Sequence, residues 1–252
     1  MQAHDIEYEI LGDDMQAVVV ALDPGEAVQA EAGAMMFMED GILMNTETGG
    51  GVMKGLKRML AGESFFITSF LNRAGDKRRV AFAAPYPGRV LALNLRETGP
   101  MLCQRDAYLC SAYGIDISVA FTRRLGAGFF GGEGFILQRL TGDGLAFVHA
   151  GGFLVERRLG PGELLRVDTG CLAAFQEGVD YDIEPVTGLK TAFFGGEGLF
   201  FAVLRGPGAV YLQTLPFSRV ADRVLAAAAR GRGESGGLLG GLSGLTGGDR
   251  RF

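Results

Sequence analysis

The sequence predicts an all-β fold, with strands packed as a β-sandwich or in a barrel-like arrangement. First, short apolar runs recur along the chain and are separated by turns that contain glycine or proline. Second, the 41 glycines suit many tight turns and disfavour long helices. Third, one glycine-glutamate motif occurs three times, followed each time by large apolar residues. We therefore expect three internal repeats about a pseudo-threefold axis, with one or two short helices.

The repeated motif is clearest at residues 131–137, returns at 195–201 and has a degenerate copy at 62–67. Its glycines allow the backbone to turn before the chain enters a strand. The three glutamates, Glu63, Glu133 and Glu197, have two interpretations. Either they are turn residues that face water, or they form a ring about the axis that binds a cation or a partner.

A second marker precedes each copy of the motif. A turn and a short apolar run that begin at Pro24 and Gly33 recur at Pro161 and Gly170, and residues 105–114 resemble them between the two. Because the two markers keep their order and a similar separation, the sequence predicts one β-rich domain over about 1–220. Its expected repeats are about 5–96, 97–160 and 161–216.

The elements follow from local patterns. Residues 6–10 and 16–22 read as a hairpin, and the methionines of 35–38 are expected to fill irregular gaps in the core. Helical spacing of apolar residues predicts a short helix over 52–61, and Ser218 can cap a second helix over 217–230. The glycine-rich segment 231–252 is expected to be a flexible tail, with docking of its leucines on a neighbour as the alternative. Further strands are expected at 79–83, 90–95, 145–150, 153–158 and 209–215.

Charge and composition exclude several classes of protein. The net charge of −5 argues against nucleic-acid binding. Cys103, Cys110 and Cys171 form an odd set without metal-type spacing, so we expect buried free thiols in a reducing compartment. The first residues lack the basic and apolar regions of a signal peptide, and no apolar run is long enough to span a bilayer. A cytoplasmic location is expected, with peripheral membrane contact open.

The sequence contains no recognisable catalytic set. It has only two histidines, His4 and His149, which are too few for a histidine-based metal site, and His149 is expected to be a hydrogen-bonded core or edge residue. The stretch Gly126–Gly131 matches a dinucleotide-binding pattern by letter, but it precedes a strand rather than a helix. We therefore expect a protein that is not an enzyme and needs no cofactor or metal.

A more informative feature is the stretch before each glutamate motif, which combines cations with an apolar pair. If the repeats share an axis, these three stretches lie at one end of the molecule. They would then form a basic and apolar face suited to an anionic membrane or a partner, or their apolar residues would plug the core. The predicted face consists of Met53, Leu56, Lys57, Arg58, Met59, Leu60, Arg123, Arg124, Phe129, Phe130, Lys190, Phe193 and Phe194.

Two stretches also resemble a known family. Residues 8–36, with Pro24-Gly25-Glu26 and Glu31-Ala32-Gly33, and residues 56–66 are similar to the altered-inheritance-of-mitochondria family, in its uncharacterised bacterial branch. The resemblance covers about residues 5–220. It implies a duplicated β-rich fold like that of the tryptophan RNA-binding attenuation protein, and it supplies no catalytic residues. RNA binding does not carry over, because this chain is acidic and lacks a ladder of cations.

These observations lead to one expected function and an alternative. The leading expectation is a non-enzymatic scaffold or interaction protein that self-associates and contacts a membrane surface peripherally or a protein partner. The alternative is a protein that binds a small molecule or an anion inside the barrel.

Overall fold

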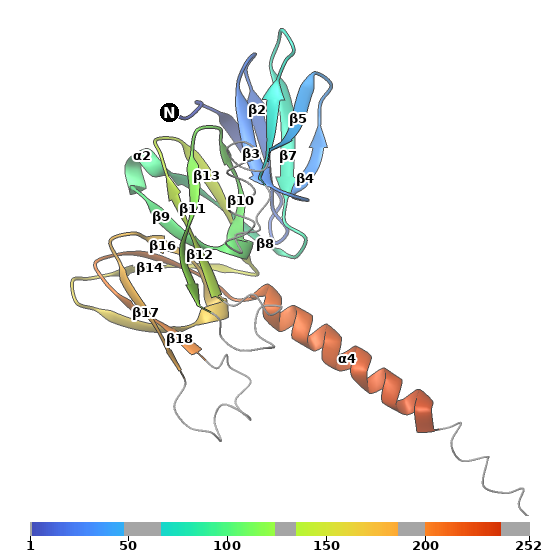
Figure 1. Cartoon of the computed structure of the whole chain (residues 1–252), viewed down its shortest axis with the longest axis vertical. Helices are drawn as coiled ribbons and strands as arrows, with labels where there is room; N and C mark the ends of the chain where they lie inside the picture. Colours follow the sequence, from blue (N-terminus) through green and yellow to red (C-terminus); the bar gives the residue numbers. More distant parts are fainter. Residues whose placement is uncertain (1, 48–66, 124–134, 186–199, 238–252) are drawn as a thin grey trace, which may run out of the picture. The chain divides into compact units, whose positions relative to one another are not determined.

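The computed structural model describes residues 2–47, 67–123, 135–185 and 200–237, and the chain divides into two units, 1–216 and 217–252. Unit 1–216 is built almost entirely of antiparallel strands, so the all-β prediction is confirmed (Figure 1). After β1 (Glu7–Leu11), its strands fall into three successive groups of six, which we call segments I, II and III.

Segment I contains β2 (Ala17–Leu22), β3 (Ala27–Glu31), β4 (Met35–Met38), β5 (Ile42–Glu47), β6 (Ile67–Asn72) and β7 (Arg78–Ala83). Segment II contains β8 (Gly88–Asn94), β9 (Met101–Gln104), β10 (Tyr108–Ala112), β11 (Asp116–Arg123), β12 (Phe135–Thr141) and β13 (Leu145–Gly151). Segment III contains β14 (Leu154–Leu159), β15 (Leu164–Asp168), β16 (Leu172–Gln176), β17 (Asp180–Pro185), β18 (Phe200–Arg205) and β19 (Gly208–Gln213).

The same strand pairings occur in each segment. The first and third strands pair with the sixth, as in β2–β7–β4, β8–β13–β10 and β14–β19–β16. The second and fourth strands pair with the fifth, as in β3–β6–β5, β9–β12–β11 and β15–β18–β17. The third strand carries a register shift at its start each time. The connectivity is therefore repetitive, whereas the pseudo-threefold axis stays a prediction.

Neighbouring segments are joined by one further kind of pairing, between a second strand and the next segment's third strand. β3 pairs with β10, and β9 pairs with β16. These two joints produce two six-stranded sheets, β5-β6-β3-β10-β13-β8 and β11-β12-β9-β16-β19-β14. The smaller sheets are β1-β2-β7-β4 and β15-β18-β17.

Two details differ from the sequence-based expectation. The barrel-like alternative is wrong, because in the described residues every sheet ends in two different strands and none closes on itself. The segment boundaries also lie one strand earlier than the expected 96 and 160. β8 pairs with β13 and β14 pairs with β19, so each belongs with the strands that follow it. Sequence markers alone do not reveal such long-range pairing.

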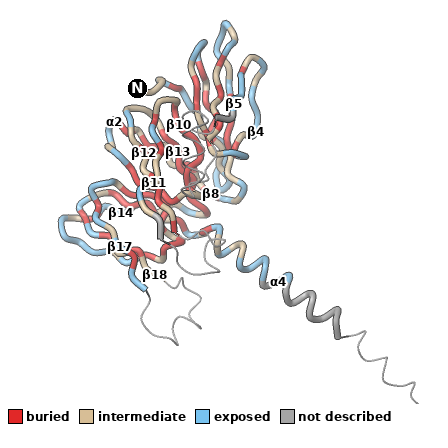
Figure 2. Tube along the Cα trace, viewed as in Figure 1, coloured by how far each residue is buried: buried red, intermediate tan, exposed pale blue. Residues whose placement is uncertain are grey.

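The core consists of two clusters of buried side chains, visible as the red stretches of the strands in Figure 2. One cluster draws mainly on segments I and II, with a few residues of segment III, and includes Phe70 and Phe82, whose rings meet edge to face with centroids 5.2 Å apart. The other draws on segments II and III and includes Phe135 and Phe175. Burial of large aromatic residues from both sides of each joint ties neighbouring segments together.

Two glutamines also bridge segments II and III, of which Gln213 is buried and Gln176 is half-buried. The Gln213 side chain accepts a hydrogen bond from Gly151 N at 2.8 Å and donates one to Gly170 O at 2.8 Å. Gln176 accepts from Ala209 N at 2.8 Å and donates to Thr98 O at 3.0 Å. These side chains satisfy backbone groups that the strand ladders leave without a partner.

Two α-helices occur in the described residues. α2 (Leu95–Thr98) is a single turn, and the side chain of Asn94 caps it by accepting from Arg96 N. α4 (Phe217–Gly237) begins at the residue where the second helix was expected and extends beyond Arg230. The helix expected over 52–61 and most of the expected tail, 238–252, lie outside the described residues.

Candidate functional site

The interaction face and the glutamate ring proposed from the sequence lie almost wholly outside the described residues. Arg123 alone is placed, as the last residue of β11, opposite Phe135. The residues outside are Met53, Leu56, Lys57, Arg58, Met59, Leu60, Arg124, Phe129, Phe130, Lys190, Phe193 and Phe194, together with Glu63, Glu133 and Glu197.

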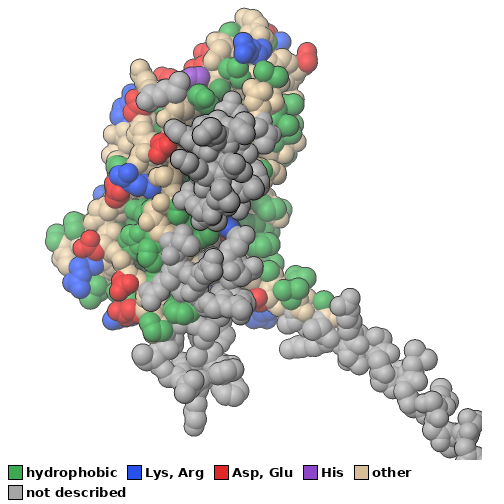
Figure 3. All heavy atoms as spheres, viewed as in Figure 1, with side chains coloured by type: hydrophobic (Ala, Val, Ile, Leu, Met, Phe, Trp, Pro, Cys, Tyr) green, Lys and Arg blue, Asp and Glu red, His purple; other side chains and the backbone are tan. Residues whose placement is uncertain are grey.

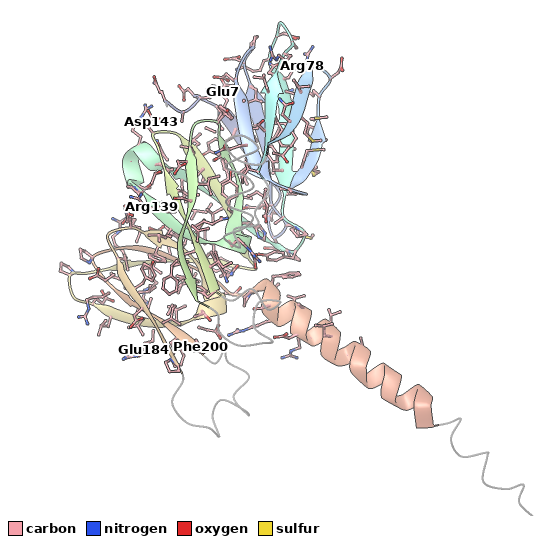
Figure 4. The ribbon with its side chains drawn as sticks, in the orientation of Figure 1. Glu7, Arg78, Arg139, Asp143, Glu184 and Phe200 are labelled. Carbon is pink, nitrogen blue, oxygen red and sulfur yellow. The ribbon has the colours of Figure 1, made fainter. Side chains whose placement is uncertain are left out.

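The strands that flank these stretches are described. Each stretch connects the fourth strand of a segment to the fifth, where the two pair antiparallel: Glu47 lies opposite Ile67, Arg123 opposite Phe135, and Pro185 opposite Phe200. Figure 4 labels Glu184 and Phe200 at the third of these strand ends. The three stretches therefore hold equivalent positions in the strand order. Their meeting at a common face stays a prediction.

The described surface offers a different candidate, the outer edge of β4. This strand ends its sheet, and Met36, Phe37 and Met38 are 53%, 40% and 40% exposed. Figure 3 shows hydrophobic side chains along the margin of unit 1–216 on which Figure 1 places this strand. We call Met36, Phe37 and Met38 the β4 edge. The expectation that the methionines of 35–38 fill gaps in the core is wrong for Met36 and Met38, because no further strand covers them in the described part of the chain, whereas Met35 packs against the first core cluster.

The β4 edge stands out when the strands at the ends of the sheets are compared. An exposed strand edge can pair with another chain, and proteins usually protect it with charged residues. Among the described residues, every other end strand contains at least one charged residue, for example Glu7 in β1, Arg89 in β8 and Glu156 in β14. β4 contains none. Its exposed, uncharged residues are therefore typical of a contact surface.

Sequence reasoning missed this edge for a physical reason. Residues 35–38 are apolar without interruption, which is equally typical of a strand buried on both faces. Exposure depends on whether another strand lies alongside, and that partner is distant in sequence. One signal in the sequence could have indicated this edge: residues 35–38 contain no charged residue, whereas the other strands at the ends of the described sheets each contain at least one.

A partly buried acidic group lies at the end of β3. Burial raises the pKa of Glu31 to about 7; Asp106 raises that pKa further, and Arg105 lowers it. Arg105 also forms an ion pair with Asp106, with Nη2 and Oδ1 3.1 Å apart. Glu31 can therefore exchange a proton near neutral pH. The resemblance to a known family drew attention to this position, but the sequence gave no indication of its shifted pKa.

His149 is a core residue, as expected, but its ring is not fully hydrogen-bonded. It is 2% exposed, and Nδ1 has no hydrogen-bond partner among the described residues. Burial lowers the pKa of His149 to about 4, and its ring meets Tyr86 edge to face at 4.6 Å. Its imidazole is therefore neutral over most of the physiological range. The expectation of a fully hydrogen-bonded histidine is wrong at Nδ1.

Two further findings on the described ranges concern metal ions and membranes. No group of three His, Cys, Asp or Glu side chains there is arranged to hold a metal ion. None of the helices placed by the structure is both long and apolar enough to cross a bilayer. Cys103, Cys110 and Cys171 are not joined in disulfides; Cys103 and Cys110 are buried, and Cys171 is only half-buried.

Comparison with known proteins gives consistent matches. The family described as mitochondrial biogenesis AIM24 matches residues 8–215. An uncharacterised protein of Streptococcus pyogenes serotype M6 is 28% identical over 215 residues, which cover 81% of this chain and 83% of that protein. A crystal structure of a Streptococcus pyogenes protein has the same fold, with a TM-score of 0.73 and 23% identity, and covers 88% of this chain and 99% of that one. The chain therefore belongs to the mitochondrial biogenesis AIM24 family.

Proposed function

We propose that this protein is a non-enzymatic scaffold that self-associates through the β4 edge. The observation that supports this function is the 40–53% exposure of three consecutive apolar residues, Met36, Phe37 and Met38, on a strand without charge. Such an edge offers both backbone hydrogen-bonding groups and apolar surface to a second strand. Burying it removes apolar area from water, which stabilises an assembly by roughly 25 cal/mol per Å².

The alternative function, binding of a small molecule or an anion in a barrel interior, has less support in the described residues. The sheets in the described residues are open, and the space between them holds the two core clusters. Close packing of such clusters supports a structural role for the interior. The scaffold is therefore the function that we retain.

Location and membrane contact form the finer part of this proposal. Free cysteines support a reducing compartment such as the cytoplasm. Peripheral contact with an anionic membrane would use the cation-containing stretches before the glutamate motifs, and flotation with anionic vesicles at low and high salt tests it. Binding that falls with salt would support an electrostatic contact, whereas no flotation at low salt would remove the membrane from the proposal.

The experiment for the scaffold compares two matched double variants by analytical ultracentrifugation. Phe37→Ser with Met38→Ser changes the β4 edge, and Leu43→Ser with Met44→Ser changes two similarly exposed residues, 43% and 46%, on neighbouring β5. We expect the natural chain and the β5 variant to form oligomers and the β4 variant to be monomeric. Circular dichroism checks that each variant stays folded. A natural chain that is monomeric at all concentrations would refute self-association.

A further inference from the structure

The two joints between segments have the same register. At the first, Cys110, Ser111 and Ala112 lie opposite Ala30, Gln29 and Val28. At the second, Ala174, Phe175 and Gln176 lie opposite Cys103, Leu102 and Met101. Each joint gains one more backbone hydrogen bond one residue further along, from Tyr113 N to Ala27 O and from Glu177 N to Pro100 O, both 3.1 Å long.

The two joints involve equivalent residues, because pairing within each segment aligns the second and third strands of the three segments. Glu31, Gln104 and Asp168 end their second strands opposite Ile67, Leu137 and Phe201 of the fifth strands. In the third strands, the register shift places Phe37, Cys110 and Ala174 at one equivalent position. The joint is thus a defined contact between a second and a third strand, and it is formed twice in one chain.

Two strands of these kinds remain without such a partner. β4 is the third strand of segment I, and β15 is the second strand of segment III. Each ends its sheet in the described part of the chain, and the two belong to different sheets. The first segment therefore has a third strand, β4, and the last segment a second strand, β15, each with an edge available for this kind of pairing.

Burial shows what the missing contact would cover. At the two joints, the positions equivalent to the β4 edge are buried: Leu109 is 2% exposed, and Ala173 is 0% exposed. The corresponding residue of β4, Met36, is 53% exposed. Phe37 and Met38 are likewise more exposed than the residues at the equivalent positions of the two joints. The apolar character of this strand suits a position that is buried when a neighbour is present.

We propose that β15 of one copy pairs with β4 of a second copy and so forms the joint a third time, between chains. This proposal rests on the proposed self-association and assigns its partner strand and register. Carrying over the shared register places Val167 opposite Phe37, Arg166 opposite Met38 and Leu165 opposite Glu39. The contact is antiparallel and head to tail.

The side chains at this register are compatible. The long aliphatic part of Arg166 can cover Met38 while its charged end stays at the surface, where Nε lies 3.7 Å from Glu184 Oε2. Asp40 lies diagonally across the ladder from Arg166, within reach of a long side chain, so that their charges are complementary. Leu165 opposite Glu39 resembles the second joint, where Met101 lies opposite Gln176.

The geometry of the contact determines the type of assembly. A head-to-tail contact uses two different surfaces, so each copy keeps one edge free for the next. Such assemblies are rings when the rotation per copy closes and filaments when it does not.

The register is tested by disulfide formation in a Cys171→Ser background, which removes the half-buried thiol. Equal amounts of Met38→Cys and Arg166→Cys chains are mixed, unfolded and refolded together, and oxidised. The proposed register makes Met38 and Arg166 a hydrogen-bonded antiparallel pair, whose Cα atoms lie about 5.5 Å apart, a separation that suits a disulfide. We expect a cross-linked dimer that contains one chain of each kind, in about tenfold higher yield than for the control mixture of Met44→Cys and Arg166→Cys.

Backbone pairing is tested at Arg166 by proline and alanine. Ala27 and Pro100 are the equivalents of Leu164, and their carbonyl groups accept hydrogen bonds across the two joints. Backbone groups of a strand point to the same side at every second residue. The N–H of Arg166, two residues after Leu164, therefore points toward the proposed joint. Arg166→Pro removes this donor on an outer edge, whereas Arg166→Ala keeps it. We expect Arg166→Pro to be a folded monomer and Arg166→Ala to remain oligomeric.

The outcomes separate the two proposals. A natural chain that is monomeric refutes both self-association and this joint. Oligomers that persist in Arg166→Pro, or that give no mixed disulfide above the control, refute the joint and leave self-association through the β4 edge standing. A disulfide within single chains of a Met38→Cys, Arg166→Cys double variant also refutes it, because β4 and β15 would then meet inside one molecule.

Discussion

At the scale of single residues, Glu31 and His149 respond to pH in opposite ways. The pKa of Glu31 is raised from 4.5 to about 7 by burial, so the folded chain holds an extra proton between these values and loses stability as the pH rises through them. The pKa of His149 is lowered from 6.5 to about 4 by burial, so the unfolded chain holds the extra proton and stability increases as the pH rises from about 4 to 6.5. The two effects overlap and offset each other between about pH 4.5 and 6.5.

Single substitutions should separate these effects. In Glu31→Gln, only the His149 contribution remains, so the free energy of unfolding should rise with pH between 4.5 and 6.5 more steeply than in the natural chain. In His149→Gln, it should fall over the same range. Each group contributes at most about 1.4 kcal/mol per pH unit. Urea unfolding at several pH values measures the slopes, and parallel profiles for all three proteins would contradict the assignment.

At the scale of elements, the contact between segments II and III includes a buried polar network as well as apolar packing. Gln213 is 4% exposed, and its side chain accepts a hydrogen bond from Gly151 N and donates one to Gly170 O. Gly151 and Gly170 are both buried. Gln138 in β12 of the same sheet is 1% exposed, yet its Oε1 has no hydrogen-bond partner in the described residues. Two glutamines with similar burial thus differ in what they stabilise.

This difference predicts unequal effects of one substitution at two sites. Gln213→Leu leaves two buried backbone groups unpaired and should lower the free energy of unfolding by about 2–4 kcal/mol. Gln138→Leu removes a poorly satisfied amide from an apolar site and should be nearly neutral or stabilising. Chemical denaturation of both variants measures the two changes; equal losses would show that the network around Gln213 is not decisive.

At the scale of the whole molecule, self-association should make stability depend on concentration. Partners that bind only the folded chain raise its melting temperature by mass action. We expect the Tm of the natural chain to rise as its concentration increases and that of Arg166→Pro to stay constant. Scanning calorimetry over a hundredfold range of concentration checks this, with Arg166→Ala as the control that should behave like the natural chain. A constant Tm for all three would argue against assembly.

Other features of the whole molecule stay predictions. The fold is shared with a solved bacterial protein, whereas the likeness to the tryptophan RNA-binding attenuation protein is an expectation from family resemblance. The glutamate ring and the basic and apolar face depend on residues that the structure does not describe. The stretches that contain these residues connect the fourth strand to the fifth in each segment, so they hold equivalent positions in the strand order.

The sequence by itself determined the strand-rich character, most turn positions and the family, because these follow from local alternation, glycine and proline placement, and short motifs. The tertiary structure alone decided that the sheets are open, that β8 and β14 pair with later strands, and that Met36, Phe37 and Met38 face outward. The reason is physical. A residue's backbone preference depends on its neighbours in the chain, but its burial depends on which distant strand lies beside it. In the described residues, β4 and β15 have no such strand on their outer edges.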